Sequence, residues 1–218
     1  MSGMVLSYYL AADVESVEFE FKDSTGQPFF SIKSAPKTKG FQRVAAFPTY
    51  PSFRGFQGMI LWSGFSSPIA APPGEYTVTM KAGAFSQSQK IRWLRDPRSV
   101  ATDADLVEKF RLQRKIAERI SQANDAVVQI RLIRAEVDKV IATLSDASTK
   151  NLAEKLKAQL TAVEETIYQT KNQSGQDPLN YPIRLNDKLS GVLSNVSNGL
   201  KPTEQAVKVF ELLSGQLE

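Results

Sequence analysis

Apolar and polar residues alternate in several short stretches of the first hundred residues. Within 16–22, Val17, Phe19 and Phe21 fall on one side of an extended chain and charged residues on the other, which is typical of a half-buried strand. Further strands are predicted at 5–10, 29–32, 41–47, 59–62, 76–82 and 85–94. About seven short strands separated by turns predict an antiparallel β-sandwich of the immunoglobulin or fibronectin type III kind over residues 1–97.

The spacing of apolar residues changes to steps of three and four from the junction at 95–106 onward, which predicts amphipathic helices. The third of these helices is expected to begin with Asn180 as its N-cap and with Tyr181 and Pro182 in its first turn. Because such helices need partners and the loops are short, 102–218 is predicted to be an antiparallel bundle of three to four helices. The predicted helices cover 103–144, 149–173, 181–198 and 203–217. The fold class is therefore all-β followed by all-α, in two domains.

Composition supports the same division and excludes several kinds of chemistry. Sixteen of the 20 aromatic residues lie in 1–101, and the net charge of +4 also arises there, because 102–218 holds 16 basic and 16 acidic residues. The chain has no cysteine and no histidine, which excludes disulfides, thiolate nucleophiles, Cys/His zinc sites and imidazole catalysis. The modest basic excess does not indicate a nucleic-acid partner, and no apolar run approaches the roughly 18 residues of a membrane span.

Two groups of charged residues are candidate catalytic or anion-binding sites. Glu18 and Glu20 share one face of a predicted strand, as a pair of glycosidase carboxylates would, but a solvated face explains them better. The basic run Lys90, Arg92, Arg95 and Arg98 suits a polyanion, yet a strand edge protected by charge is the favoured interpretation. No catalytic residue, metal ligand or cofactor site is predicted.

The remaining candidates are positions for a ligand or an interface. Phe53, Phe56, Trp62 and Phe65 lie in a Gly/Ser/Pro-rich loop that must either bury its rings or use them, so a sugar-stacking platform at 53–65 is an alternative to plain anchoring. Tyr181 and Arg184 belong to the stretch "QDPLNYPIRLNDKL". Its acidic, amide, aromatic and basic residues are typical of a catalytic loop, but the stretch is better interpreted as a helix start.

Several motifs together resemble one bacterial family. They are "PGEYTVTMKAG", Arg95-Asp96-Pro97-Arg98, the helix start "DADL", "QDPLNYPIRLNDKLSGVL" and "KPTEQAVKVFELLSGQLE". Together they resemble the C-terminal region of bacterial sortilin-like proteins with BNR or Asp-box repeats, often labelled glycosyl hydrolases. At 40–47 the chain reads "GFQRVAAF" where the family pattern has a Trp-Asp pair, and no Asp-box is present.

The resemblance implies a non-catalytic accessory segment, a β-sandwich with helices, that follows an upstream β-propeller in a larger secreted, periplasmic or cell-surface protein. The chain opens with Met1-Ser2-Gly3 and shows no signal-peptide pattern, and we expect it to be part of a longer protein. Alternative hypotheses are a carbohydrate-binding sandwich that uses loop 53–65, a helical module that forms a homodimer, and a carboxylate enzyme, for which we expect no turnover.

Overall fold

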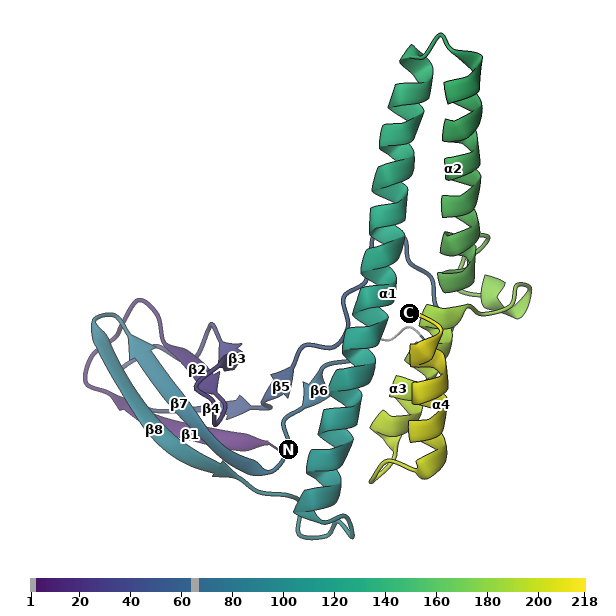
Figure 1. The fold of residues 1–218 in the computed structure, drawn as a ribbon. Helices are drawn as coiled ribbons and strands as arrows, with labels where there is room; N and C mark the ends of the chain where they lie inside the picture. The colour runs from purple at the N-terminus through teal and green to yellow at the C-terminus, as the bar shows by residue number, and fades with distance from the viewer. Residues whose placement is uncertain (1–2, 64–66) are drawn as a thin grey trace. The chain divides into compact units, whose positions relative to one another are not determined.

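A computed structural model of the protein describes residues 3–63 and 67–218, and it combines antiparallel strands with four α-helices (Figure 1). The strands are β1 (Met4–Leu10), β2 (Glu18–Lys22), β3 (Pro28–Ile32), β4 (Gly40–Ala46), β5 (Thr49–Tyr50), β6 (Ile69–Ala70), β7 (Gly74–Ala82) and β8 (Phe85–Trp93). The helices are α1 (Asp103–Thr143), α2 (Ala147–Ile167), α3 (Leu185–Asn198) and α4 (Glu204–Gly215), with a short 3-10 helix η1 (Asp177–Leu179) before α3.

The described chain divides into two compact units, and the division departs from the predicted boundaries. The β unit comprises 3–51 and 67–110, and the helical unit comprises 52–63 and 111–218. Loop 52–63 was predicted to belong to the sandwich, and all of α1 to the bundle. Instead, the loop joins the helices, and the first turns of α1 join the strands. The reason for the first difference is that backbone groups of the loop are hydrogen-bonded by side chains of the helices.

The β unit contains the small β5–β6 pair and two larger sheets that share one core. Strands β1 and β4 form a two-stranded sheet, and β3-β2-β7-β8 form a four-stranded sheet, with all neighbours antiparallel. Leu10 and Ala46 of the first sheet are buried in one cluster with Phe19, Phe21 and Val78 of the second. The alternation predicted at 16–22 is therefore confirmed, since its apolar side is buried. The β7–β8 turn contains Gly83 at φ +59°, a conformation that favours glycine.

A buried tyrosine fixes the chain where it enters β7. The Tyr76 hydroxyl donates a hydrogen bond of 2.7 Å to the carbonyl oxygen of Pro72. Burial, and secondarily the negative charge of Asp23, raises the pKa of Tyr76 to about 12, so the phenol stays protonated and remains a donor at neutral pH. Phe29 stacks on Tyr50 at 4.2 Å beside it. These contacts hold the short β5 segment against the four-stranded sheet.

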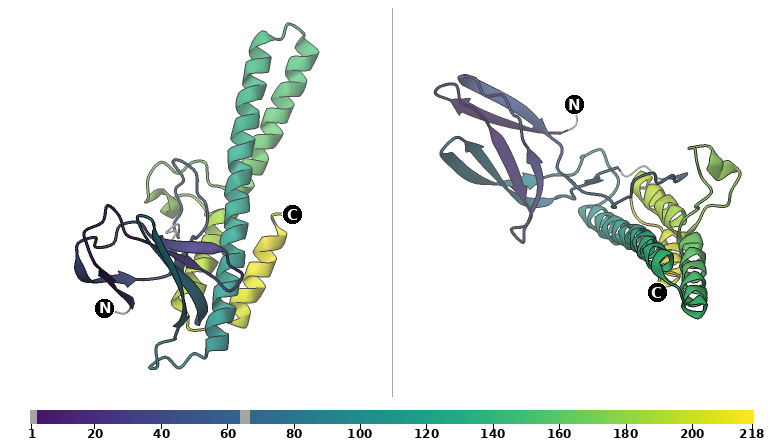
Figure 2. Two further views of the ribbon diagram at one scale, coloured as in Figure 1. Left: turned by 90° about the vertical axis from the view of Figure 1, so that its left-hand side faces the viewer. Right: turned by 90° about the horizontal axis from the view of Figure 1, so that it is seen from above.

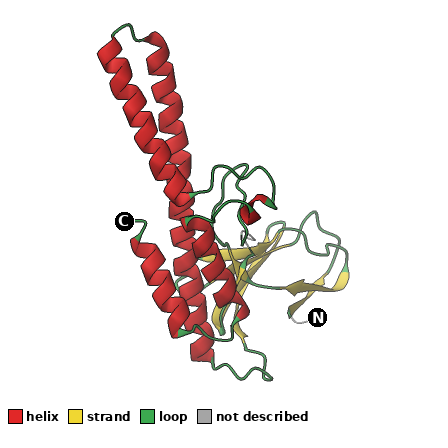
Figure 3. Ribbon diagram, turned by 90° about the vertical axis from the view of Figure 1, so that its right-hand side faces the viewer, coloured by secondary structure: helices red, strands yellow, loops and turns green. Residues whose placement is uncertain are grey.

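The helical unit contains an antiparallel hairpin of α1 and α2, and Figure 2 shows the two helices side by side. Arg131 and Arg134 of α1 pair with Glu164 of α2, and Asp138 pairs with Lys157. Helices α3 and α4 also contact each other, and the views of Figure 3 and Figure 1 agree in placing them alongside α1. None of the helices that the structure describes is both long enough and apolar enough to cross a membrane.

At three of the four described helices, a side chain at the N-terminus accepts a hydrogen bond from a backbone N–H of the first turn. The Thr102 hydroxyl accepts a hydrogen bond from the Asp105 N–H, and the Asp105 carboxylate accepts one from the Thr102 N–H. Asp146 caps α2 by accepting from the Thr149 N–H, and Thr203 caps α4 in the same way. Thr102 is therefore the N-cap of α1, and α2 begins two residues before the predicted 149.

The predicted start of the third helix at 181 is wrong, because α3 begins at Leu185 with Arg184 as its N-cap. The residue before a proline is disfavoured in the α conformation, so Tyr181 cannot easily lead Pro182 into a helix. Asn180 instead ends η1, and its N–H donates to the carbonyl oxygen of Asp177. The Asp177 carboxylate accepts hydrogen bonds from the N–H groups of Gln173 and Ser174, which lowers its pKa.

Two other predicted elements differ in the structure. The predicted strand 59–62 is a loop segment, and the chain forms the two-residue strands β5 and β6 on either side of it. The second helix was predicted to reach 173 but ends at Ile167, because Tyr168 turns to an extended conformation and its ring contacts Phe56 at 5.0 Å. The two differences are linked, because Met59 and Leu61 of the loop pack in one cluster with Tyr168.

Candidate functional site

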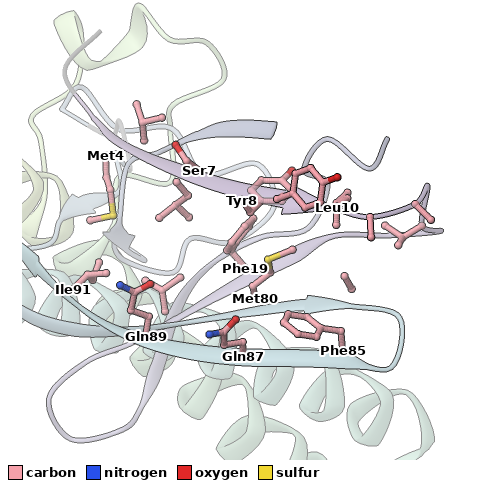
Figure 4. Close-up of a pocket in the computed structure, with 18 of the residues that line it drawn as sticks. Met4, Ser7, Tyr8, Leu10, Phe19, Met80, Phe85, Gln87, Gln89 and Ile91 are labelled. Carbon is pink, nitrogen blue, oxygen red and sulfur yellow. The ribbon is translucent and has the colours of Figure 1, made fainter. Parts of the chain in front are cut away.

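The candidate site is an open groove of about 880 Å³ in the β unit, between β1 and the β7–β8 hairpin (Figure 4). It exists because the two sheets differ in width. Neighbouring strands lie about 4.8 Å apart, so a two-stranded sheet covers roughly half of a four-stranded one. The groove is the strip of the larger sheet that β1 and β4 leave uncovered.

The inner side of β8 forms one wall of the groove. Phe85, Gln87, Gln89 and Ile91 lie opposite Ala82, Met80, Val78 and Tyr76 of β7, so the two sets share one face of the sheet. The side chains of Phe85, Gln87 and Gln89 are exposed although this face belongs to the core elsewhere. Figure 4 shows the two glutamines pointing from the hairpin toward β1, with Met80 and Phe19 between the two walls.

The groove has the chemistry of a binding surface. Among the described residues that line it, Arg92 is the only one that is charged at neutral pH. Burial raises the pKa of Tyr8, whose hydroxyl donates to the carbonyl oxygen of Pro36, so this phenol is also neutral. The lining therefore offers apolar surface, amide groups and backbone edges. In the described ranges, no group of three or more acidic side chains could hold a metal ion.

The predicted aromatic candidates Phe53 and Phe56 anchor loop 52–63 to the helical unit. Phe53 is buried, and Phe56 packs edge-on against Tyr168 and lies under the guanidinium of Arg131 at 4.8 Å. Trp62 is half exposed, and Phe65 lies outside the described residues. The described rings therefore do not form a shared exposed platform, and nothing in their arrangement favours carbohydrate stacking.

Polar side chains of the helices clamp the backbone of this loop, and sequence reasoning missed them. The Asp187 carboxylate, in the first turn of α3, accepts hydrogen bonds from the N–H groups of Trp62 at 2.8 Å and Ser63 at 3.0 Å. The Tyr168 hydroxyl accepts from the Ile60 N–H. Three other clamp residues are Ser121, Asn124 and Ser190. The one signal in the sequence is that polar residues stand at positions where an apolar helix stripe would be expected to continue.

A second buried carboxylate joins the two helices of the hairpin. Glu164 is 1% exposed, and its Oε1 accepts a 2.7 Å hydrogen bond from Nε of Arg131. Its Oε2 lies 2.8 Å from Nη2 of Arg134. Both buried acids of the described helical unit therefore have structural partners. Asp187 also borders a pocket of about 540 Å³, but the described residues of that lining include no second acid.

Apart from Arg92 of the basic run, none of the other predicted candidates in the described ranges lines the groove. Tyr181 is about one-third exposed, with Nζ of Lys171 5.8 Å from its ring centre, and Arg184 caps α3. Glu18 and Glu20 make exposed ion pairs with Lys33 and Lys22. In the basic run, Arg95 pairs with Asp103 and Arg98 with Asp96, while Arg92 lines the groove.

Comparison with known proteins adds no assignment to this geometry. No protein-family model matches the chain, and no curated protein matches it. The function is therefore argued from the groove, the clamp and the helical hairpin.

Proposed function

We propose that the chain is a non-catalytic interaction module that recognises a partner by shape through the groove of its β unit. The observation that carries this proposal is the lining of the groove, which combines apolar side chains and two exposed glutamines with a single charged group, Arg92. General acid–base catalysis needs at least one positioned acid or base within reach of the reacting atoms, and the described residues of the lining include no Asp, Glu, His, Lys or Cys. Burial of apolar surface and hydrogen bonds to amides suits binding instead.

The proposed fold of the β unit is a fibronectin type III-like sandwich with one strand position empty. Two features support it: the antiparallel pairing of two strands over four, and the Tyr76 hydroxyl bonded to Pro72 four residues upstream. The latter corresponds to the tyrosine corner of such sandwiches. For the helical unit we propose an antiparallel bundle, supported by the contacts of α3 with α4 and of α1 with α2.

The proposed context is a larger secreted, periplasmic or cell-surface protein of the sortilin-like kind, in which the module follows a β-propeller. This part of the proposal rests on the motifs "PGEYTVTMKAG" and "QDPLNYPIRLNDKLSGVL". In that setting the groove would contact another segment of the assembly, and any hydrolase activity would belong to the propeller.

The reading frame that surrounds this sequence gives the first test. We expect an upstream segment with Asp-box repeats, and we expect that segment, expressed separately, to bind the module in isothermal titration calorimetry. The variant Gln87→Trp should weaken binding at least about tenfold, because the indole fills the groove. Thr77→Trp, on the outer face of the same hairpin, is the matched control.

The same preparations test whether the module is an enzyme. Purified protein should show no turnover of aryl-glycoside or sialoside substrates. Turnover that disappears in Gln87→Trp but not in Thr77→Trp would contradict the non-catalytic proposal. A reading frame without a propeller would contradict the proposed context. Equal binding by Gln87→Trp and Thr77→Trp would contradict the proposed binding surface.

A second candidate function, self-association through the α1–α2 hairpin, is favoured by an exposed apolar face. Arg134, Asp138 and their partners in α2 form a charged side of the hairpin. On the opposite side, helical geometry brings together apolar residues that recur at steps of three, four or seven. The exposed members of this apolar face are Ile133, Val140, Leu152, Leu156 and Val163, which are 43–52% exposed apart from Leu152 at 64%.

The size of this apolar face suits a pair of identical hairpins. A helix of the length of α2 is about 30 Å long, and two helices side by side span about 20 Å, which gives roughly 600 Å². A standard interface buries about 800 Å² on each partner. Two hairpins joined through these faces would form a four-helix arrangement with the charged sides in water.

Light scattering tests self-association. The mass of the wild-type protein should rise above the 24.1 kDa of the monomer as concentration increases. Leu156→Lys should remain monomeric, because it places a charge in the centre of the face. Ala158→Lys, two residues along α2 on the opposite side, should behave as wild type. A monomer mass at every concentration would remove this candidate function.

A further inference from the structure

The uncovered strip beside β1 has room for one added strand. Two strands face four, and the inner side of β8 that lines the groove is largely exposed. Phe85, at one end of this strip, is 52% exposed although Ala82, its cross-strand neighbour in β7, is buried. A strand placed beside β1 would cover this inner side and convert the two-on-four arrangement into three-on-four.

The edge of β1 that borders the groove carries the backbone groups that such a strand needs. β1 pairs with β4 along its whole length, from Met4 with Ala46 to Leu10 with Gly40. In an antiparallel pair, every second residue directs its N–H and C=O away from the partner. No other strand in the described ranges pairs with β1. The groove therefore combines an apolar floor with a row of backbone donors and acceptors along one wall.

We propose that β1 accepts an extended segment of another polypeptide chain as an additional strand, which lies in the groove over β8. This inference rests on the proposed function and specifies its partner. Recognition would follow the strand-addition mode, in which backbone hydrogen bonds supply affinity and alternate side chains supply specificity. A strand that matches the seven residues of β1 would be about 23 Å long.

The residues of the groove set the chemistry of that segment. Its inward side chains would meet Phe85 and Ile91 near the two ends, where apolar residues fit, and Gln87 and Gln89 in between, where side chains that form hydrogen bonds fit. Proline is excluded at the positions that donate to β1 because it lacks the N–H. The segment is therefore expected to be rich in β-branched residues and free of proline at those positions.

A second copy of the chain does not fit the groove as well as a separate segment. Another copy would bring its own two-stranded sheet and its own uncovered β8 to the contact. Edge-to-edge pairing of two copies would therefore bring β4 and β8 of the second copy to the groove along with its β1, and the groove has room for one added strand only. A lone extended segment carries no such second sheet, and it fills the strip completely.

The proposal is tested by selecting from random seven-residue peptides displayed on phage against the intact protein. The tightest selected peptide is then synthesised with a fluorescent label. Gln89→Trp should weaken its binding at least about tenfold, because the indole occupies the strand position. Lys90→Trp, the next residue, points to the opposite face of β8 and should change affinity less than twofold. Alternate single prolines in the peptide should each weaken binding about tenfold.

Hydrogen exchange gives the readout that is specific for strand addition. On binding, alternate amide protons of β1 should become protected, whereas the remaining β1 amides, already bonded to β4, should not change. A selected peptide that is sensitive to Gln89→Trp but tolerates every proline and protects no β1 amide would overturn strand addition and leave the interaction module standing. If every selected peptide bound Gln89→Trp as tightly as wild type, the strand-addition proposal would also be overturned. Binding of the upstream segment tests the interaction-module proposal separately.

Discussion

Replacing Asp187 by alanine is expected to lower the free energy of unfolding by about 2–4 kcal/mol. The carboxylate is 3% exposed and accepts charge-assisted hydrogen bonds from the backbone N–H groups of Trp62 and Ser63. Alanine would leave both donors without this acceptor, and it would also remove a negative charge from the first turn of α3, where the helix dipole favours one. Loop 52–63 should therefore loosen from the helices before the helices themselves unfold.

Urea unfolding followed by circular dichroism and by tryptophan fluorescence measures this effect, because Trp62 lies in the loop and Trp93, the second tryptophan, lies in β8. Asp187→Asn should be intermediate, since an amide keeps one acceptor but adds an N–H₂ donor beside the backbone donors. The matched control is Asp125→Ala, which removes an ion pair with Arg54 whose two side chains are more than half exposed. That change should cost less than about 1 kcal/mol. Equal urea midpoints for the alanine variants would contradict the clamp.

Replacing Glu164 by alanine is expected to lower the free energy of unfolding by about 2–4 kcal/mol. Glu164 is almost fully buried and contacts Arg131 through Oε1 and Arg134 through Oε2. Removal of one partner from a fully buried ion pair lowers the free energy of unfolding by about 3–5 kcal/mol. The expected loss is smaller here because the guanidinium groups of Arg131 and Arg134 are partly in water. The hairpin should then separate first near the C-terminal end of α2.

Thermal unfolding of neighbouring variants isolates this contribution. Glu165→Ala changes the next residue, whose side chain is exposed, and should shift stability by no more than about 0.5 kcal/mol. Glu164→Gln should fall between wild type and Glu164→Ala, because one hydrogen bond to Arg131 can remain. Equal unfolding temperatures for Glu164→Ala and Glu165→Ala would show that the ion pairs do not stabilise the hairpin.

The elements that sequence reasoning predicted correctly are those whose signals lie within a few residues. The alternation around Phe19 and Phe21 identified a half-buried strand, and both residues are in the core. The apolar spacing after the junction predicted a first helix over 103–144, and α1 covers Asp103–Thr143. These features depend on backbone geometry and on side-chain period, which the local sequence carries.

The misplaced elements are those in which a distant contact overrode the local pattern. Apolar residues 59–62 resemble a strand, yet the N–H of Ile60 is bonded to Tyr168 and that of Trp62 to Asp187, which lie 108 and 125 positions further along the chain. The aromatic residues of loop 52–63 were noticed as a group, but whether a ring is buried or offered to a ligand depends on the helix surface that it meets. Sequence alone supplied no such surface.

The sequence by itself determined that an aromatic-rich β segment precedes a helical segment, where most of the strands and helices lie, and that cysteine and histidine chemistry is excluded. Only the tertiary structure decided that loop 52–63 belongs to the helices, that Asp187 and Glu164 are structural acids, and that a groove lies beside β1. The physical reason is that a groove arises from the number of strands in each sheet and from the edges left unpaired. Those properties are set by pairing between distant segments, and no single strand records them in its own residues.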